Sequence, residues 1–204
     1  MSTVPLRETR FDPITAGLPV FRRLLEAAAC PGSVVALDDV RLAVEPPELA
    51  SACLLLLTVL DRDLTFYVTG LGARSVTEYL RFNTGARSAP PEVADFVLVS
   101  GSSSAGEIAR VNRGRGGGSG TGATVVYAPR MISAAPIGGV VKLAVAAPNL
   151  SGVRRLHVAG IDDSELVWLH ALGWGPLGVE VWLAGADGSL AVISRSCLWM
   201  WESE

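Results

Sequence analysis

The sequence contains few of the residues that build metal sites and disulfide frameworks, with three cysteines and two histidines among 204 residues. Cys30, Cys53 and Cys197 are scattered, odd in number and without zinc-type spacing. His157 and His170 have no cysteine or aspartate neighbour at the spacing of a metal site or a catalytic triad. We therefore expect structural roles for these five residues and no bound metal.

Charged residues and long hydrophobic runs are also scarce. Charged residues make up 18% of the chain and the formal net charge is −3, which gives no support for nucleic-acid binding. The longest apolar run, 50–60, is too short to span a bilayer and predicts a buried helix. The first residues, MSTVPLRETRFDPI, lack the apolar core of a signal peptide, so we expect a cytoplasmic protein. Half of the residues are hydrophobic, which suggests surfaces shared with partners.

Motifs for phosphate and nucleotide binding are incomplete. The Gly-rich segment 112–122 has no Gly-Lys-Ser/Thr ending and is interpreted as a long, flexible surface loop. The stretch GLGARS, which begins at Gly70, half-matches the dinucleotide-binding fingerprint, and Glu92 and Asp95 lie about where a ribose-binding acid would follow. A plain strand-to-helix turn is the simpler interpretation, and nucleotide binding through Gly70 and Gly72 is the alternative.

Patterns for a nucleophile or for paired carboxylates are missing as well. The three serines at 102–104 are not framed by a nucleophile-elbow motif. The acidic pairs Asp61 with Asp63 and Asp162 with Asp163 are typical of turns and helix caps. From spacing alone the chain has no recognisable active site.

Helix and strand signals alternate along the chain. Hydrophobic periodicity predicts helices at 21–30, 46–60, 75–82, 106–111 and 163–172. β-branched and apolar runs predict strands at 34–37, 64–69, 94–100, 123–128, 140–146, 154–160, 178–185 and 189–194. This order indicates an α/β fold, one domain over 1–204, with a mixed sheet flanked by helices and with its antiparallel part near the C-terminus.

The segment FRRLLEAAACPGSVVAL, 21–37, illustrates how the elements are recognised. Phe21, Leu24, Leu25 and Ala28 follow the spacing of one helix face, which predicts that they pack inward. Proline and glycine at 31–32 end this helix, and a short strand follows.

The same segment resembles the N-terminal signature of the PhnH subunit of bacterial carbon–phosphorus lyase. Further stretches agree with that family in order and spacing, and together they cover about 11–196: LLLLTVLDRDLTFYV, YLRFNTGA, GTGATVVYA, VVKLAVAAPNLSG, VAGID and GPLGVEVWLAGADGSLAVISRS. The sequence departs from the family pattern in its long Gly-Arg loop and in the final ISRS. These departures concern local loop geometry.

The resemblance implies a fold similar to the large domain of pyridoxal-phosphate-dependent transferases without the cofactor site. The one lysine, Lys142, lies within a strand-like run and is consistent with that lack of a cofactor. The family subunit forms a homodimer by itself and joins PhnG, PhnI and PhnJ in a core complex. That complex replaces adenine of ATP with an alkylphosphonate, giving ribose 1-phosphonate 5-triphosphate. The resemblance therefore implies a non-catalytic assembly subunit of this transferase complex.

Two surface features follow from these motifs. Arg22, Arg23 and Arg81 lie in family-like stretches, and arginine suits bidentate phosphate contacts, so they are candidates for anion or partner binding. Ordinary solvated helix charge is the competing interpretation. Four of the five tryptophans lie from Trp174 to Trp201, which favours a homodimer interface near the C-terminal CLWMWE stretch.

Overall fold

The computed structural model describes residues 11–12, 15–38, 42, 44–114, 122–148, 150–172 and 177–202. Its helices are α1 (Gly17–Ala29), η1 (Pro47–Leu49), α2 (Ala50–Val59), α3 (Ala73–Thr84), η2 (Glu107–Arg110) and α4 (Asp163–Ala171), η marking 3-10 turns. Its strands are β1 (Val35–Ala36), β2 (Thr65–Gly70), β3 (Arg87–Ser88), β4 (Phe96–Ser100), β5 (Thr124–Tyr127), β6 (Met131–Ser133), β7 (Val141–Ala146), β8 (Arg154–Ala159), β9 (Glu180–Ala184), β10 (Ser189–Ile193) and β11 (Leu198–Glu202).

The strands form two sheets. Seven of them follow the order β1-β10-β9-β5-β4-β2-β3, in which β9, β5, β4, β2 and β3 run parallel while β10 and β1 are antiparallel. The other four form a fully antiparallel sheet in the order β11-β7-β8-β6. The predicted α/β class with a mixed sheet is confirmed. The sequence did not reveal that the C-terminal antiparallel strands form a separate sheet, or that β3, β6 and β11 exist.

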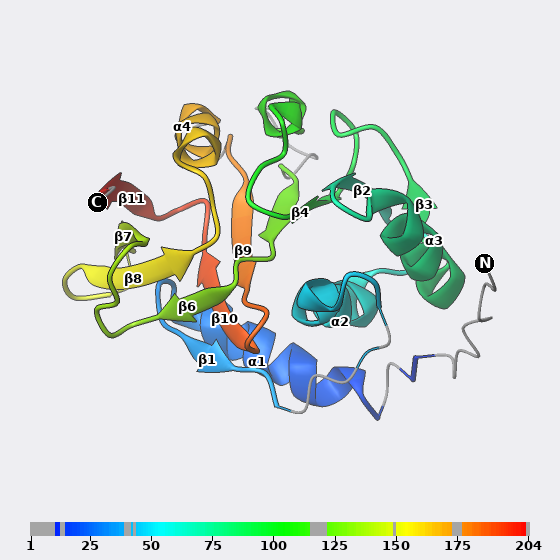
Figure 1. The fold of residues 1–204 in the computed structure, drawn as a ribbon, viewed down its shortest axis with the longest axis horizontal. Coiled ribbons are helices and arrows are strands. Elements are labelled where there is room, and N and C mark those ends of the chain that lie inside the picture. Colours follow the sequence, from blue (N-terminus) through cyan, green and yellow to red (C-terminus); the bar gives the residue numbers. More distant parts are fainter. Residues whose placement is uncertain are drawn as a thin grey trace.

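The large sheet is the middle of three layers (Figure 1), with α1, α2 and α3 on one face and α4, η2 and the small sheet on the other. Side chains alternate between the two faces, as a strand requires. In β9, Val181 and Leu183 pack toward the small sheet, whereas Trp182 and Ala184 pack toward the helices. Both cores therefore share the central sheet as a common wall.

Helix α2 is buried on all sides, as its apolar run predicted. Residues 51–57 of this helix are all buried, between α1 and α3 and against the large sheet. No helix in the described ranges is long and apolar enough to cross a membrane. The eleven-residue apolar run is therefore an internal element of the fold.

The inward face of α1 differs from the prediction. The buried residues are Val20, Leu24 and Ala27, whereas Phe21 and Leu25 are 41% and 53% exposed. The helix is rotated by about one position from the predicted orientation because the run of small residues at its C-terminal end lets Ala27 approach α2 and β10. A set of apolar side chains is left facing outward.

This rotation predicts opposite outcomes for two neighbouring leucines. Leu24→Ala should lower the free energy of unfolding by about 2–5 kcal/mol because it leaves a cavity in the helical core. Leu25→Ala, the matched control, should change it by less than about 0.5 kcal/mol because the side chain is half exposed. Urea denaturation followed by circular dichroism measures both, and equal losses would contradict the orientation of α1.

Candidate functional site

A cavity of about 500 Å³ opens at the carboxyl ends of the parallel strands β2, β4 and β5. Its wall includes Leu71, Ser100, Gly101 and Ala128, which end or follow these strands, and Leu49 of η1 lies at its base. A volume of this size suits a small organic molecule. We call this cavity the crevice.

The connections of the sheet explain why the crevice lies there. After β2 the chain turns into α3 on the helical face, and after β4 it turns into η2 on the opposite face. Adjacent parallel strands whose connections diverge in this way leave a gap at their carboxyl ends, which is the usual ligand position in open α/β sheets. The crevice is therefore the candidate functional site of the fold.

The glycines proposed for nucleotide binding lie at this edge but are required by packing. A Cβ on Gly70 would lie 2.0 Å from the Ser100 carbonyl oxygen, and one on Gly72 would lie 2.7 Å from Cδ of Pro46. Both have positive φ, at 94° and 70°. The turn between β2 and α3 therefore needs glycine whether or not a ligand is present. The strand-turn-helix context is as predicted, and it adds nothing specific for phosphate.

A buried carboxyl group that the sequence did not reveal supports one wall of the crevice. Glu165 of α4 is fully buried and accepts four hydrogen bonds. Its Oε1 accepts from Ser103 Oγ at 3.1 Å, Ser104 N at 2.8 Å and Ser104 Oγ at 2.9 Å, and its Oε2 accepts from Tyr127 Oη at 2.7 Å. Four donors fit the ionised, acceptor-only carboxylate. Glu165 thus fixes the loop after β4 to α4 and β5.

The Tyr127 phenol, which donates to this carboxylate, is held in its neutral form. Burial, followed by the nearby Glu165 carboxylate, raises the pKa of Tyr127 well above its usual value. Ile108 of η2 adds a further bond by donating its backbone N–H to Ser104 Oγ at 3.3 Å. These groups satisfy one another, so the cluster holds structure rather than offering a free nucleophile or base.

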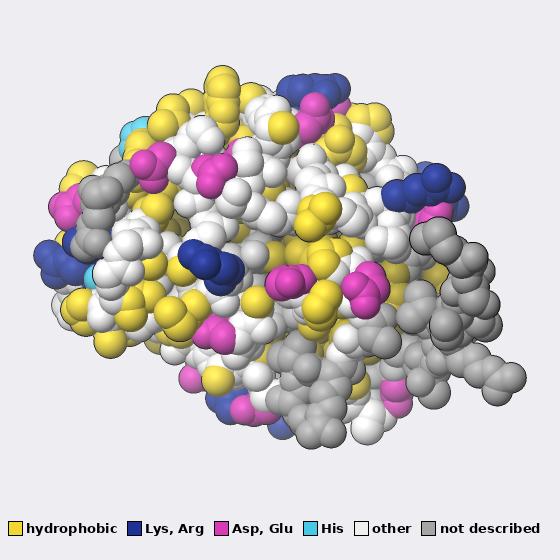
Figure 2. All heavy atoms as spheres, viewed as in Figure 1, with side chains coloured by type: hydrophobic (Ala, Val, Ile, Leu, Met, Phe, Trp, Pro, Cys, Tyr) yellow, Lys and Arg dark blue, Asp and Glu magenta, His cyan; other side chains and the backbone are white. Residues whose placement is uncertain are grey.

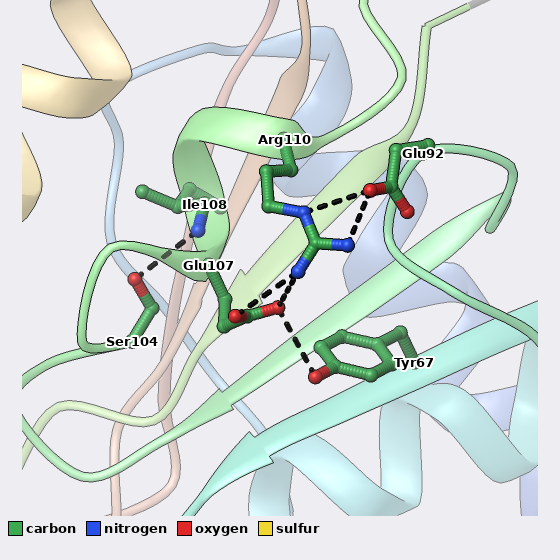
Figure 3. Close-up of polar contacts among 6 residues, drawn as sticks. All are labelled: Tyr67, Glu92, Ser104, Glu107, Ile108 and Arg110. Atoms are coloured by element: carbon green, nitrogen blue, oxygen red, sulfur yellow. Dashed lines mark hydrogen bonds and ion pairs between the residues drawn. The ribbon is translucent and has the colours of Figure 1, made fainter.

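A second polar network connects η2 to the sheet (Figure 3). Arg110 donates through Nε to Glu92 Oε1 at 2.7 Å and pairs through Nη1 with Glu107 Oε2 at 3.0 Å, while Tyr67 Oη donates to the same Glu107 oxygen at 3.3 Å. Burial, then Glu107, raises the pKa of Tyr67. The side chains of Tyr67, Glu92, Glu107 and Arg110 thus contact one another in a single network. The network anchors the chain directly before the Gly-rich segment, of which 115–121 lie outside the described residues.

The three candidate arginines are not brought together. Arg22 and Arg23 lie on α1 and Arg81 in the last turn of α3, with α2 packed between these helices. Arg23 is engaged by Glu26 at 3.1 Å and Asp38 at 3.0 Å, and both partners raise its pKa. Arg81 lines a surface groove of about 690 Å³ together with Arg87 and Phe82. The groove lies beside the edge strand β3. Anion or partner binding by Arg22, Arg23 and Arg81 stays a prediction.

The cysteines and histidines lie in structural surroundings. Burial raises the pKa of the Cys53 thiol to about 12, so this group is unreactive at neutral pH. His157 is buried in β8, and the His170 ring lies edge-on to Trp199 and Trp201 at 5.7 and 5.5 Å. Among the described residues no group of three or more histidine, cysteine, aspartate or glutamate side chains could hold a metal ion.

The surface gives no sign of a nucleic-acid interface on the face that Figure 2 shows. Basic side chains there are separated from one another, and acidic side chains lie between them. Hydrophobic side chains fill much of the space between the charges. A binding face for a polyanion would instead gather basic residues in a patch or stripe.

The chain matches a known protein family. A family model described as "Bacterial phosphonate metabolism protein (PhnH)" matches residues 11–198. The match extends from the first described residue to the start of β11, and so includes the large sheet, three strands of the small sheet and every helix that the structure describes. No curated protein matches the chain.

The buried carboxylate makes a prediction about stability. Glu165→Gln should lower the free energy of unfolding by about 2–4 kcal/mol, because it places an amide NH₂ among buried donors and removes the charge that they stabilise. The exposed Glu78→Gln on α3 is the control and should cost less than about 0.5 kcal/mol. Chemical denaturation at neutral pH tests both, and a tolerant Glu165→Gln would show that the four hydrogen bonds contribute little.

Proposed function

The chain belongs to the PhnH family of bacterial phosphonate metabolism proteins, and from that premise we propose that it is a non-catalytic assembly subunit of the carbon–phosphorus lyase core complex. In this role it supports the step that joins an alkylphosphonate to the ribose of ATP with loss of adenine. The chain works in the cytoplasm, without a cofactor of its own, beside PhnG-, PhnI- and PhnJ-like subunits. The family match over residues 11–198 carries the proposal.

The polar clusters support a structural role. Glu165 and the Glu107–Arg110 pair each form their hydrogen bonds with groups within the chain. Tyr127, with its raised pKa, is a poor acid or base at neutral pH. Such saturated clusters position loops and helices, which is what a scaffold subunit requires.

The exposed apolar side chains support contacts with partners. Among the described residues, seven of the thirteen exposed large apolar side chains lie on three elements, each between 41% and 63% exposed: Leu18, Phe21 and Leu25 on α1, Val167 and Trp168 on α4, and Leu198 and Met200 on β11. Exposed apolar side chains that are grouped on one element often mark interaction sites in soluble proteins. A subunit that is covered on several sides in a complex would expose these groups when it is alone.

The groove at Arg81 is the proposed anion-binding or partner-binding contact. Arg81 and Arg87 flank it, and no carboxylate in the described part of the chain lies within ion-pair distance of either guanidinium. Phe82, 57% exposed, supplies an aromatic contact beside them. Glu78 also lines the groove but is paired with Arg74, so the two arginines beside the exposed ring suit an acidic segment or a phosphate group. Arg22 is exposed on α1 and stays a weaker candidate.

The edge strand β11 supports the homodimer. Among the described strands it pairs only with β7, which leaves its other edge without a described neighbour, and Leu198 and Met200 are exposed on it. Open apolar edge strands tend to pair with a second chain. Two copies related by a twofold axis near Met200 would join their small sheets through β11.

The assembly role predicts a paired result. The purified chain, incubated with ATP and methylphosphonate, should release no adenine, whereas deletion of its gene should abolish growth on methylphosphonate as the sole phosphorus source. Growth of the deletion strain would overturn the pathway role. Adenine release by the lone chain would instead favour the alternative of a small-molecule enzyme that binds a nucleotide near Gly70 and Gly72.

The deletion strain, complemented with variants of the gene, also tests the role of the groove. A chain with Arg81→Ala and Arg87→Ala should restore growth less well and should copurify less PhnG-, PhnI- and PhnJ-like protein than the wild type. Arg155→Ala, which removes an exposed arginine of β8 outside the groove, is the control and should behave as the wild type does. Unchanged growth and copurification of the double variant would remove the groove from the partner surface.

The homodimer makes a separate prediction. Multi-angle light scattering should give a dimer at micromolar concentration, and Met200→Lys should shift it toward the monomer because two lysines would meet near the twofold axis. Val93→Lys replaces an equally exposed residue in the loop before β4 and should leave the dimer intact. A monomeric wild type, or a dimer that tolerates Met200→Lys, would contradict pairing through β11.

A further inference from the structure

The crevice contains three charged side chains with no partner in the described part of the protein. Arg130, Asp162 and Glu48 line it, and none makes a side-chain hydrogen bond or ion pair with a described residue. Arg23, Arg74, Arg110 and Arg195, in contrast, each pair with an acidic side chain. Charges of both signs are therefore available to a ligand at this one place.

Asp162 lies at a helix position where the carboxylate normally accepts a hydrogen bond. It is the N-cap residue of α4, where an aspartate usually accepts a hydrogen bond from the first turn, yet it makes no such side-chain bond. Its backbone N–H instead donates to the Ser102 carbonyl at 3.0 Å, which holds the residue at the crevice wall. The backbone of Asp162 is thus held at the crevice wall, while its carboxylate has no hydrogen-bond or ion-pair partner among the described residues.

Arg130 is also held in place by its surroundings. Its backbone N–H donates to the Ala159 carbonyl at 2.8 Å, and its side chain covers Gly160, where an added Cβ would lie 3.2 Å from the Arg130 Cγ. Gly160 and Asp162 lie only two residues apart, so the cation and the carboxylate border the same end of the crevice. Such pre-positioned groups bind a ligand at a low cost in side-chain entropy.

The rest of the crevice is apolar and firmly built. Leu49, Pro46, Leu71 and Ala128 contribute hydrocarbon surface. Leu71 N–H donates to the Ser100 carbonyl at 3.3 Å, and Ser100 Oγ donates back to the Leu71 carbonyl at 2.5 Å, so the turn after β2 is tied to the end of β4. The Glu165 cluster fixes the opposite loop. The cavity is formed before any ligand arrives.

We propose that the crevice binds a small zwitterion with an apolar body, its anionic group against Arg130 and its ammonium group against Asp162. One guanidinium and two carboxylates in the same cavity attract a single anionic group and an ammonium, and disfavour a polyanion such as a nucleoside triphosphate. The apolar body packs on the hydrocarbon surface of Leu49, Leu71 and Ala128. This site is independent of the assembly role, because it needs only the lone chain.

The test uses the purified, ¹⁵N-labelled chain and L-leucine as the probe. Millimolar leucine should shift the amide signals of Gly101, Ser102 and Gly160 in a saturable way. The probes 4-methylpentanoate, which lacks the ammonium, and 3-methylbutylamine, which lacks the carboxylate, should each bind at least about tenfold more weakly, since each loses one charge-assisted contact. ATP should bind more weakly than leucine.

Variants separate the site from unspecific effects. Arg130→Gln and Asp162→Asn should each weaken leucine binding by about tenfold while the remaining amide signals stay in place, which shows that the fold is intact. Arg155→Gln, an exposed arginine of β8 outside the crevice, is the control and should bind leucine as the wild type does. Absence of saturable shifts, equal binding of the three probes, tighter binding of ATP, or indifference to Arg130→Gln would each overturn the proposal.

Discussion

A mostly parallel sheet has two apolar faces, and both must be covered. This constraint organises the molecule. The strands β9, β5, β4 and β2 send alternate side chains to opposite sides, where three helices form one cover and α4 with a four-stranded antiparallel sheet forms the other. Because the connections after β2 and β4 leave toward opposite covers, the carboxyl edge between these strands is left open. The crevice is thus a consequence of covering the sheet on both sides.

Polar groups that enter this arrangement need internal partners. Glu165 is fully buried in α4, and its charge is tolerated because serine and tyrosine donors surround both of its oxygens. The same bonds fix the loop after β4 and hence one wall of the crevice. Arg130 and Asp162 differ, because they lie at the cavity wall with solvent access and with no described partner. The contrast between satisfied and free charges distinguishes the supporting groups from those that could meet a ligand.

The outer surface is consistent with membership in an assembly. The family is one of phosphonate metabolism, and the described surface carries apolar side chains on α1, α4 and β11 instead of one confined patch. A chain whose inner core is complete does not need these groups for its own stability, as their exposure shows. The residues of these apolar groups and those that line the crevice do not overlap, so the two proposals can be tested separately.

The sequence by itself determined the succession of elements, because hydrophobic period and turn residues are local properties. It predicted the buried helix at 50–60 and the strands at 64–69 and 94–100 to within a residue or two of their observed ends. Family membership also followed from motif order. The rotation of α1 did not, because Phe21 and Leu24 both fit an apolar face, and only contact with α2 and β10 selects Leu24.

The sequence did not reveal the site either. Glu165, Tyr127 and Ser104 meet across 38 and 61 residues of chain, and Arg130 lines the same cavity as Glu48 only in the folded protein. Contacts between distant segments leave no local pattern, so the tertiary structure alone decided which charges were satisfied and which were free.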